Sequence, residues 1–265
     1  MFKEVIYETK ITFCFPVVGH GADDDAGVCY GGWYASGGGG TTGEEASGGG
    51  SEIVAQIGEQ GYKTLKSAIL NANNGETIKL SADVSVESEI DFTDKAITLD
   101  LNGKTIDGKV PSSYSVIEAK GESASLTIKD TSSETNGKLI SDNYGISAAE
   151  GGKLIIESGT IESNYAAMAG NNTAGDMNFE VNGGTLTSKS SEAIYMPGQV
   201  QLTVNAGEIN GGISARMGQI TVNGGTINGM TSNQAADKME DYFNYSGSAW
   251  IGDAIYIWGG TYTSN

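Results

Sequence analysis

The sequence predicts an all-β chain: a right-handed, single-stranded parallel β-helix with an N-terminal capping helix and a short tethered strand segment in front of it. Three observations predict this fold. A glycine-centred motif recurs through the second half of the chain, a helix-then-strand signal precedes it, and residues 35–51 are rich in glycine and serine. They divide the chain into an N-terminal docking segment (1–34), a flexible linker (35–51) and a β-helix domain (52–265).

The recurring motif is found in KLIIESGTIES (153–163), NFEVNGGTLTS (178–188), QLTVNAGEING (201–211), QITVNGGTING (219–229) and AIYIWGGTYTS (254–264). Aligning the segments on one glycine of each gives the column Gly159, Gly184, Gly207, Gly225 and Gly260. Five residues earlier stand Leu154, Phe179, Leu202, Ile220 and Ile255; three earlier stand Ile156, Val181, Val204, Val222 and Ile257; two later stand Ile161, Leu186, Ile209, Ile227 and Tyr262. Apolar residues two apart indicate a strand with one inward face. The glycine indicates a corner with positive φ, so each repeat is predicted to be one coil of a solenoid.

Two earlier segments fit the same register. In ITLDLNGKTI (97–106), the apolar columns receive Leu99, Leu101 and Ile106, and Lys104 stands in the glycine column. In SLTIKDT (125–131), the fit is looser and runs through Leu126 and Ile128. The solenoid is therefore predicted to begin well before the first glycine of the column.

A second, weaker strand recurs in the connections, as YGIS (144–147), YAAM (165–168), EAIYM (192–196) and GISA (212–215). These short segments of small and apolar residues predict another wall of the same coil. Asn182, Asn205 and Asn223, which precede the glycine column, are predicted to form a stacked amide ladder or to shape the turns. The long gap before the last repeat predicts a short helical excursion or cap within 232–250.

The segment YKTLKSAILNANNGETIKL (62–80) predicts a helix followed by a strand. Thr64 can act as the N-cap, the stripe Leu65, Ala68, Ile69 and Ala72 has helical spacing, and Asn74-Gly75 ends the helix. A helix here would cover the open end of the solenoid, where backbone edges are otherwise unpaired.

These three patterns together resemble the pectate-lyase-like parallel β-helix repeat proteins: the helix-then-strand segment, ITLDLNGKTI, and the repeated Gly-Gly-Thr. The resemblance extends from residue 62 to the C-terminus. It implies the fold, and it implies little about function, because one fold serves many functions.

The N-terminal segment carries an alternating apolar face, and the linker after it has no core-forming residues. A segment this short cannot bury enough surface to be stable alone, so its face is expected to dock on a partner or on copies of itself, with packing against the solenoid as the alternative. The predicted docking residues are Val5, Tyr7, Ile11, Phe13 and Phe15. An anchor, a tether and a projecting solenoid resemble the head-fibre or capsid-decoration proteins of tailed phages, and that resemblance implies a homo-oligomer, with a trimer as the guess.

Composition narrows the possible partners. The formal net charge is −18 and Arg216 is the single arginine, which argues against nucleic acid as a partner. We recognise neither a secretory signal nor a run of apolar residues long enough to span a membrane. Cys14 and Cys29 have no CxxC spacing, and whether they pair stays open.

The sequence contains no recognisable set of the catalytic residues used by enzymes of the fold that it resembles. Arg216 is interpreted as a solvated or interface residue, and Gly19-His20-Gly21 with Asp23 to Asp25 as a chance likeness to a polygalacturonase motif. No catalytic, metal or cofactor residues are therefore predicted. The candidate binding residues are aromatic, and they suit sugars or protein interfaces. They are Tyr242, Phe243, Tyr245, Trp250 and Trp258.

The expected function is a non-catalytic structural and adhesive protein of the virion surface, docked on capsid proteins through residues 1–34 and able to contact host or mucosal glycans. One alternative is a bacterial cell-surface adhesin or glycan-binding module. A second is a polysaccharide depolymerase, since two carboxylates across a cleft cannot be recognised among 33 acidic residues.

Overall fold

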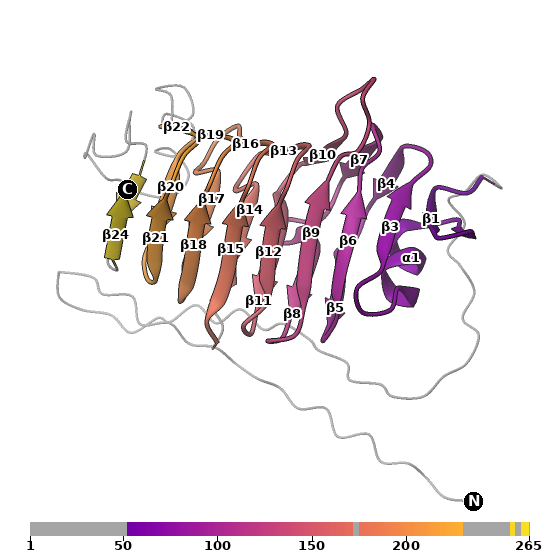
Figure 1. Cartoon of the computed structure of the whole chain (residues 1–265), viewed down its shortest axis with the longest axis horizontal. Helices are drawn as coiled ribbons and strands as arrows, with labels where there is room; N and C mark the ends of the chain where they lie inside the picture. Colours follow the sequence, from indigo (N-terminus) through magenta and orange to yellow (C-terminus); the bar gives the residue numbers. More distant parts are fainter. Residues whose placement is uncertain (1–51, 172–174, 230–254, 258–260, 265) are drawn as a thin grey trace, which may run out of the picture. The chain divides into compact units, whose positions relative to one another are not determined.

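The computed structural model describes residues 52–171, 175–229, 255–257 and 261–264. They form three sheets, and the chain passes from one to the next and then returns to the first (Figure 1). The first sheet, in spatial order, is β2 (Gln60–Tyr62), β1 (Ala55–Ile57), β3 (Thr77–Leu80), β6 (Ala96–Asp100), β9 (Ser125–Lys129), β12 (Lys153–Ile156), β15 (Met177–Val181), β18 (Val200–Val204), β21 (Gln219–Val222) and β24 (Thr261–Ser264). The second is β4 (Val84–Val86), β7 (Thr105–Gly108), β10 (Lys138–Ser141), β13 (Thr160–Ser163), β16 (Thr185–Ser188), β19 (Glu208–Asn210) and β22 (Thr226–Asn228). The third is β5 (Ile90–Thr93), β8 (Ser115–Lys120), β11 (Tyr144–Ala149), β14 (Met168–Gly170), β17 (Ile194–Met196), β20 (Ile213–Ala215) and β23 (Ile255–Ile257).

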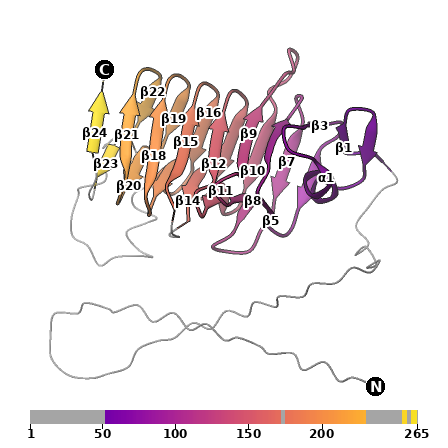
Figure 2. The same ribbon diagram turned by 60° about the horizontal axis from the view of Figure 1, so that its bottom comes forward.

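From β3 onward every pairing between neighbouring strands of a sheet is parallel, and each strand pairs with its equivalent in the next coil. Figure 2 shows the coils stacked side by side along the solenoid. The predicted parallel β-solenoid is therefore confirmed. The recurring connection segments also form one wall, the third sheet, as predicted.

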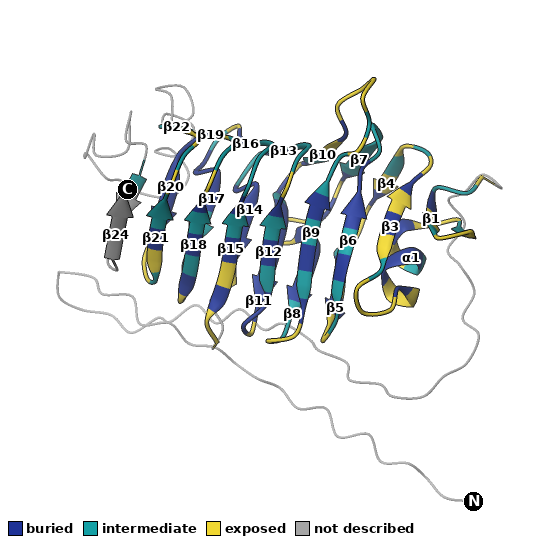
Figure 3. Ribbon diagram, viewed as in Figure 1, coloured by how far each residue is buried: buried dark blue, intermediate teal, exposed yellow. Residues whose placement is uncertain are grey.

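The core is the inside of this stack. Leu126, Leu154, Phe179, Leu202 and Ile220 are register partners in the first sheet and are at most 1% exposed. Along the strands of the first and second sheets, buried positions alternate with more exposed ones, which Figure 3 shows as alternating dark blue and teal. The period of two in the sequence thus becomes an inward and an outward face.

The glycine column marks the corner between the first and second sheets. Gly159, Gly184, Gly207 and Gly225 have φ of 90°, 75°, 94° and 91°, as the repeat predicts. A Cβ on Gly184 would lie 2.6 Å from the carbonyl oxygen of Gly159 in the coil below, so these corners need glycine for space as well as for conformation.

The asparagines before this column form the predicted amide ladder. The side-chain Nδ2 of Asn205 donates to Oδ1 of Asn182 (2.8 Å), and Nδ2 of Asn223 donates to Oδ1 of Asn205 (2.7 Å). Asn228 and Asn210 form a second such pair at the far end of the second sheet (2.7 Å).

The predicted register of residues 97–106 is wrong by two residues. Ile97 and Leu99, not Leu99 and Leu101, pair with Leu126 and Ile128. Ile106 is in its predicted column, beside Leu139. The cause is a longer corner: Leu101 is fully buried within it, and Asn102 and Gly103 turn the chain with φ of 47° and 70°.

The last repeat is also placed differently from the prediction. Ile255 pairs with Ile213 of the third sheet, and Tyr262 takes the place beside Ile220. The segment AIYI repeats the pattern of EAIYM, which is itself a third-sheet strand, so the two walls cannot be told apart by periodicity here.

The helix predicted over 65–73 is observed as α1 (Leu65–Asn71), two residues shorter at its C-terminus. The Thr64 side chain accepts a hydrogen bond from the backbone N–H of Ser67, and the helix buries Leu65, Ala68 and Ile69. Lys95 Nζ donates to the carbonyl oxygens of Ile69 (2.8 Å), Leu70 (3.0 Å) and Ala72 (2.8 Å), which satisfies carbonyl groups at the end of the helix. Strands β1 and β2 form an antiparallel hairpin, and β1 pairs with β3, so the outer edge of β3 is covered.

Candidate functional site

The third sheet differs from the other two because nearly every residue of its central strands is buried, on the outward face of the strand as well as on the inward one. Strand β8 is buried from Ser115 to Ala119, and β11 from Gly145 to Ala149. The residues that alternate with the core positions include charged ones, of which Glu118 is 5% exposed. Buried charges require partners, and this sheet supplies them.

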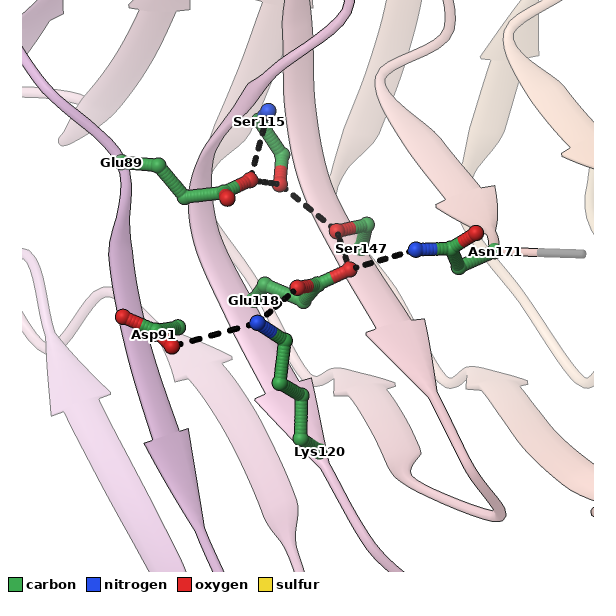
Figure 4. A network of polar contacts seen from close by, with 7 residues as sticks. All are labelled: Glu89, Asp91, Ser115, Glu118, Lys120, Ser147 and Asn171. Carbon is green, nitrogen blue, oxygen red and sulfur yellow. Dashed lines mark hydrogen bonds and ion pairs between the residues drawn. The ribbon is translucent and has the colours of Figure 1, made fainter. Parts of the chain in front are cut away.

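Seven polar side chains form one connected group here, which we call the third-sheet network (Figure 4). It reaches from the residue before β5 to the residue after β14, across four strands. Its members are Glu89, Asp91, Ser115, Glu118, Lys120, Ser147 and Asn171.

Lys120 is the cation of the network. Its Nζ lies 2.9 Å from Glu118 Oε2 and 3.1 Å from Asp91 Oδ2. Burial alone would lower the pKa of Lys120, but the hydrogen bonds and charges of Glu118 and then of Asp91 outweigh it and hold this pKa well above the usual value. The ammonium group therefore stays charged and compensates the buried Glu118.

The second oxygen of Glu118 faces the next strands. Asn171 Nδ2 donates to Oε1 of Glu118 (3.2 Å), and Ser147 Oγ lies 3.4 Å from the same atom. Ser147 Oγ is also 2.6 Å from Ser115 Oγ. This carboxylate therefore has polar neighbours from β11 and from the residue after β14, in addition to Lys120 of its own strand.

Glu89 ends the chain of contacts on the other side. The Ser115 hydroxyl and backbone N–H both lie near Glu89 Oε1, at 2.8 Å and 3.0 Å. Burial raises the pKa of Glu89, the hydrogen bonds from Ser115 partly oppose this, and the negative charge of Glu118 adds to the increase. Glu89 therefore takes up a proton more readily than an exposed glutamate does.

A row of tyrosines borders the network at the entry to β8, β11 and β14. The rings of Tyr144 and Tyr165 are stacked with centroids 5.5 Å apart, and Tyr114 is 49% exposed. The backbone N–H of Tyr144 donates to the carbonyl of Tyr114, which places these two residues in adjacent coils. The exposed ring of Tyr114 and the exposed carboxylate of Asp91 suit a ligand with both apolar and hydrogen-bonding faces.

Other buried or notable polar groups are explained by the fold. Asp100, 3% exposed, accepts hydrogen bonds from the backbone N–H groups of Asn102 and Thr131 and from the Thr131 hydroxyl. Asp130 accepts from the backbone N–H of Gly103 and Gly137, so both aspartates shape corners. Within the described ranges, no buried side-chain nitrogen or oxygen is without a partner, and no group of three or more metal-binding side chains is placed to hold an ion.

The binding residues predicted from the sequence lie outside the described residues. This applies to Tyr242, Phe243, Tyr245, Trp250 and Trp258, to the docking residues Val5, Tyr7, Ile11, Phe13 and Phe15, and to His20, Asp23, Asp24 and Asp25. Arg216 is described: it is exposed on the solenoid wall, and its guanidinium lies 5.4 Å from the ring centroid of Tyr195.

Sequence reasoning missed the third-sheet network. The signal was present in SVIEAK (115–120), where Glu118 and Lys120 are two residues apart and so share a strand face opposite to Ile117 and Ala119. Its partners Glu89, Ser147 and Asn171 come from other coils, and only the stacking register brings them near.

These features define the chain as a three-sheet parallel β-solenoid with a polar network and a tyrosine row on one sheet. Comparison with known proteins found no family model that matches, and no curated protein or solved structure with significant similarity. In the described part of the chain, no helix has the length and apolar character needed to cross a membrane.

Proposed function

We propose that this chain is a non-catalytic structural and adhesive protein, a head fibre or capsid decoration of a tailed phage, which displays its solenoid from a docking segment at residues 1–34. The observation that supports this is the uninterrupted parallel stack from β3 to β24, built on one apolar core. In such a stack each coil contacts only its neighbours, so the result is a stiff rod that holds surfaces away from its attachment point.

The tyrosine row and the third-sheet network are the surface that we propose for adhesion to host or mucosal glycans. Tyr114 offers an exposed ring, and Tyr144 and Tyr165 are half-buried and stacked on each other. The exposed carboxylate of Asp91 can accept hydrogen bonds from hydroxyl groups. This surface would act together with, or in place of, the aromatic residues predicted within 242–258.

The finer features of the fold belong to the same proposal. We take the solenoid to be right-handed and of the pectate-lyase-like type, with α1 as the cap of its first coil. Supporting this, α1 contributes Leu65, Ala68 and Ile69 to the core beside β1 and β5. The homotrimer also stays a proposal, because it rests on the phage resemblance alone.

The proposed docking role predicts the effect of removing the N-terminal segment. A chain that lacks residues 1–50 is expected to keep its β-sheet circular dichroism spectrum but to be absent from purified particles. A matched control carries charged substitutions of Tyr114 and Tyr165 and keeps the N-terminus, and it is expected to be incorporated normally. Equal incorporation of the truncated and full-length chains would contradict the docking role.

The network gives one observation in favour of the depolymerase alternative. Glu89 and Glu118 are linked carboxyl groups, and burial raises the pKa of one of them, as in the acid of a glycosidase pair. Release of reducing sugar from host polysaccharide by the wild-type chain, and its loss in Glu89→Gln, would favour this enzyme over the structural role.

A further inference from the structure

The chain of contacts from Glu89 to Glu118 has fewer hydroxyl protons than it has oxygen–oxygen contacts. Three oxygen–oxygen contacts connect them in series: Glu89 to Ser115 (2.8 Å), Ser115 to Ser147 (2.6 Å) and Ser147 to Glu118 (3.4 Å). A serine hydroxyl has a single proton to donate, and an ionised carboxylate has none. Two hydroxyl protons therefore serve three contacts when both glutamates are ionised.

The distances show which contact lacks its proton. Hydrogen bonds between oxygens are usually 2.5–3.0 Å long, so the contacts at 2.8 Å and 2.6 Å are of normal length and the one at 3.4 Å is too long. The Ser147 hydroxyl thus donates to Ser115, and Ser115 donates to Glu89. Glu118 is left facing a lone pair of Ser147.

We propose that Glu89 and Glu118 form a single proton-binding unit, in which protonation of Glu89 reverses the hydroxyls of Ser115 and Ser147 and gives Glu118 a hydrogen bond from Ser147. The step is balanced: one proton from solvent forms an O–H bond on Glu89, and no other covalent bond changes. Glu89 then donates to Ser115, Ser115 donates to Ser147, and Ser147 donates to Glu118, so all three contacts are hydrogen bonds.

The surrounding charges agree with this arrangement. Burial of Glu89, and then the charge of Glu118 from β8, disfavour a negative charge on Glu89. The hydrogen bonds from Ser115 and the charge of Lys120 favour that negative charge but do not outweigh burial. Asp91 of the strand that follows Glu89 is bound to Lys120. Helix α1, which also contacts β5, contributes one charged residue, the exposed Lys66. Glu118 keeps its ion pair with Lys120, so Glu89 is the member that accepts the proton.

The unit connects three successive coils, and its protonation should tighten them. The pKa of Glu89 is raised in the folded chain. Its contribution to stability is therefore fully present below the pKa of an unfolded glutamate, and it is lost as the pH rises through the folded pKa. This is opposite to the usual behaviour of ion-paired carboxylates, and it would help the first coils to stay folded in mildly acidic surroundings. The inference does not depend on the proposed function.

Carbon-13 NMR titration of the glutamate side chains in the full chain tests this proposal. Glu89 is expected to titrate above its ordinary range, and the Glu118 carboxyl signal should show an inflection at the same pH. In Ser147→Ala the Glu118 inflection should disappear. The midpoint of Glu89 should fall by about 0.5–1 pH unit, the shift that one ordinary hydrogen bond produces.

The controls separate the hydroxyl chain from simple repulsion between charges. Ser147→Thr keeps a hydroxyl and should behave as the wild type. Ser115→Ala removes the other hydroxyl and should also abolish the Glu118 inflection, which gives a second test if Ser147→Ala does not fold. Persistence of the inflection and of the Glu89 midpoint in Ser147→Ala would show that the glutamates sense each other only through space, and it would overturn the proposal.

Discussion

Phe179→Ala is expected to lower the free energy of unfolding by about 3–5 kcal/mol. Among the described residues, Phe179 is the largest of the fully buried side chains and is 1% exposed. It lies between Leu154 and Leu202 of the adjacent coils, in register with both. A cavity at this point removes contacts on both sides of one coil, and the rigid backbone ladders limit how far the neighbours can move to fill it.

The matched control for this variant is Asn178→Ala in the same strand. Asn178 is exposed, and its change should alter stability by no more than about 0.5 kcal/mol. Urea unfolding followed by circular dichroism measures both. If the two variants were equally stable, the inward and outward faces of β15 would be assigned incorrectly.

Lys120→Met should be the second most damaging change, with a loss of about 3 kcal/mol at neutral pH. It leaves the charge of Glu118 buried, with Asn171 as its remaining close polar donor. Because Lys120 keeps 26% of its side-chain exposure, the lower end of the range for buried pairs is expected.

Lys153→Met is the matched control, because Lys153 pairs with Glu180 at 3.5 Å on the exposed face of the first sheet. The side chains of that pair are 41% and 34% exposed, so its loss should cost at most about 0.5 kcal/mol. Urea unfolding curves at pH 7 measure the difference. Similar costs for the two lysines would contradict the role given to the network.

Much of the fold can be predicted from the sequence because each coil repeats the same physical requirements. The column Leu154, Phe179, Leu202 and Ile220 is apolar because it faces one core, and it is found in register. Gly184, Gly207 and Gly225 recur because their corners have positive φ and approach backbone in the neighbouring coil; Gly159 has the same positive φ and approaches the side chain of Leu101. Thr64 was recognised as an N-cap from its position before an apolar stripe.

The predicted register is wrong at two places: where one coil has a longer corner, and where the apolar pattern fits two sheets equally well. Around Leu101 the corner is longer, and an alignment based on apolar spacing alone slips by two residues, which preserves the inward face. At Ile255 the pattern fits two walls equally well, and only the pairing with Ile213 decides between them.

The candidate site was beyond sequence reasoning for a different reason. Glu89, Ser115 and Ser147 are ordinary polar residues when each is considered in its own strand. Their sequence separations of 26 and 32 residues follow from the lengths of particular coils, not from any motif. The network therefore requires the register of the third sheet to be known first.

The measurement that tests the central claim most directly is a distance along the stack. Thr77 and Thr221 stand in one row of the first sheet, which passes through Thr98, Thr127, Ile155, Glu180 and Thr203. At about 4.8 Å for each of these steps, their Cα atoms should be roughly 29 Å apart. Spin labels at Thr77→Cys and Thr221→Cys, with Cys14 and Cys29 replaced by serine, should give one narrow distance distribution near this value by pulsed electron resonance. A broad distribution, or a distance far from it, would contradict a single continuous parallel solenoid.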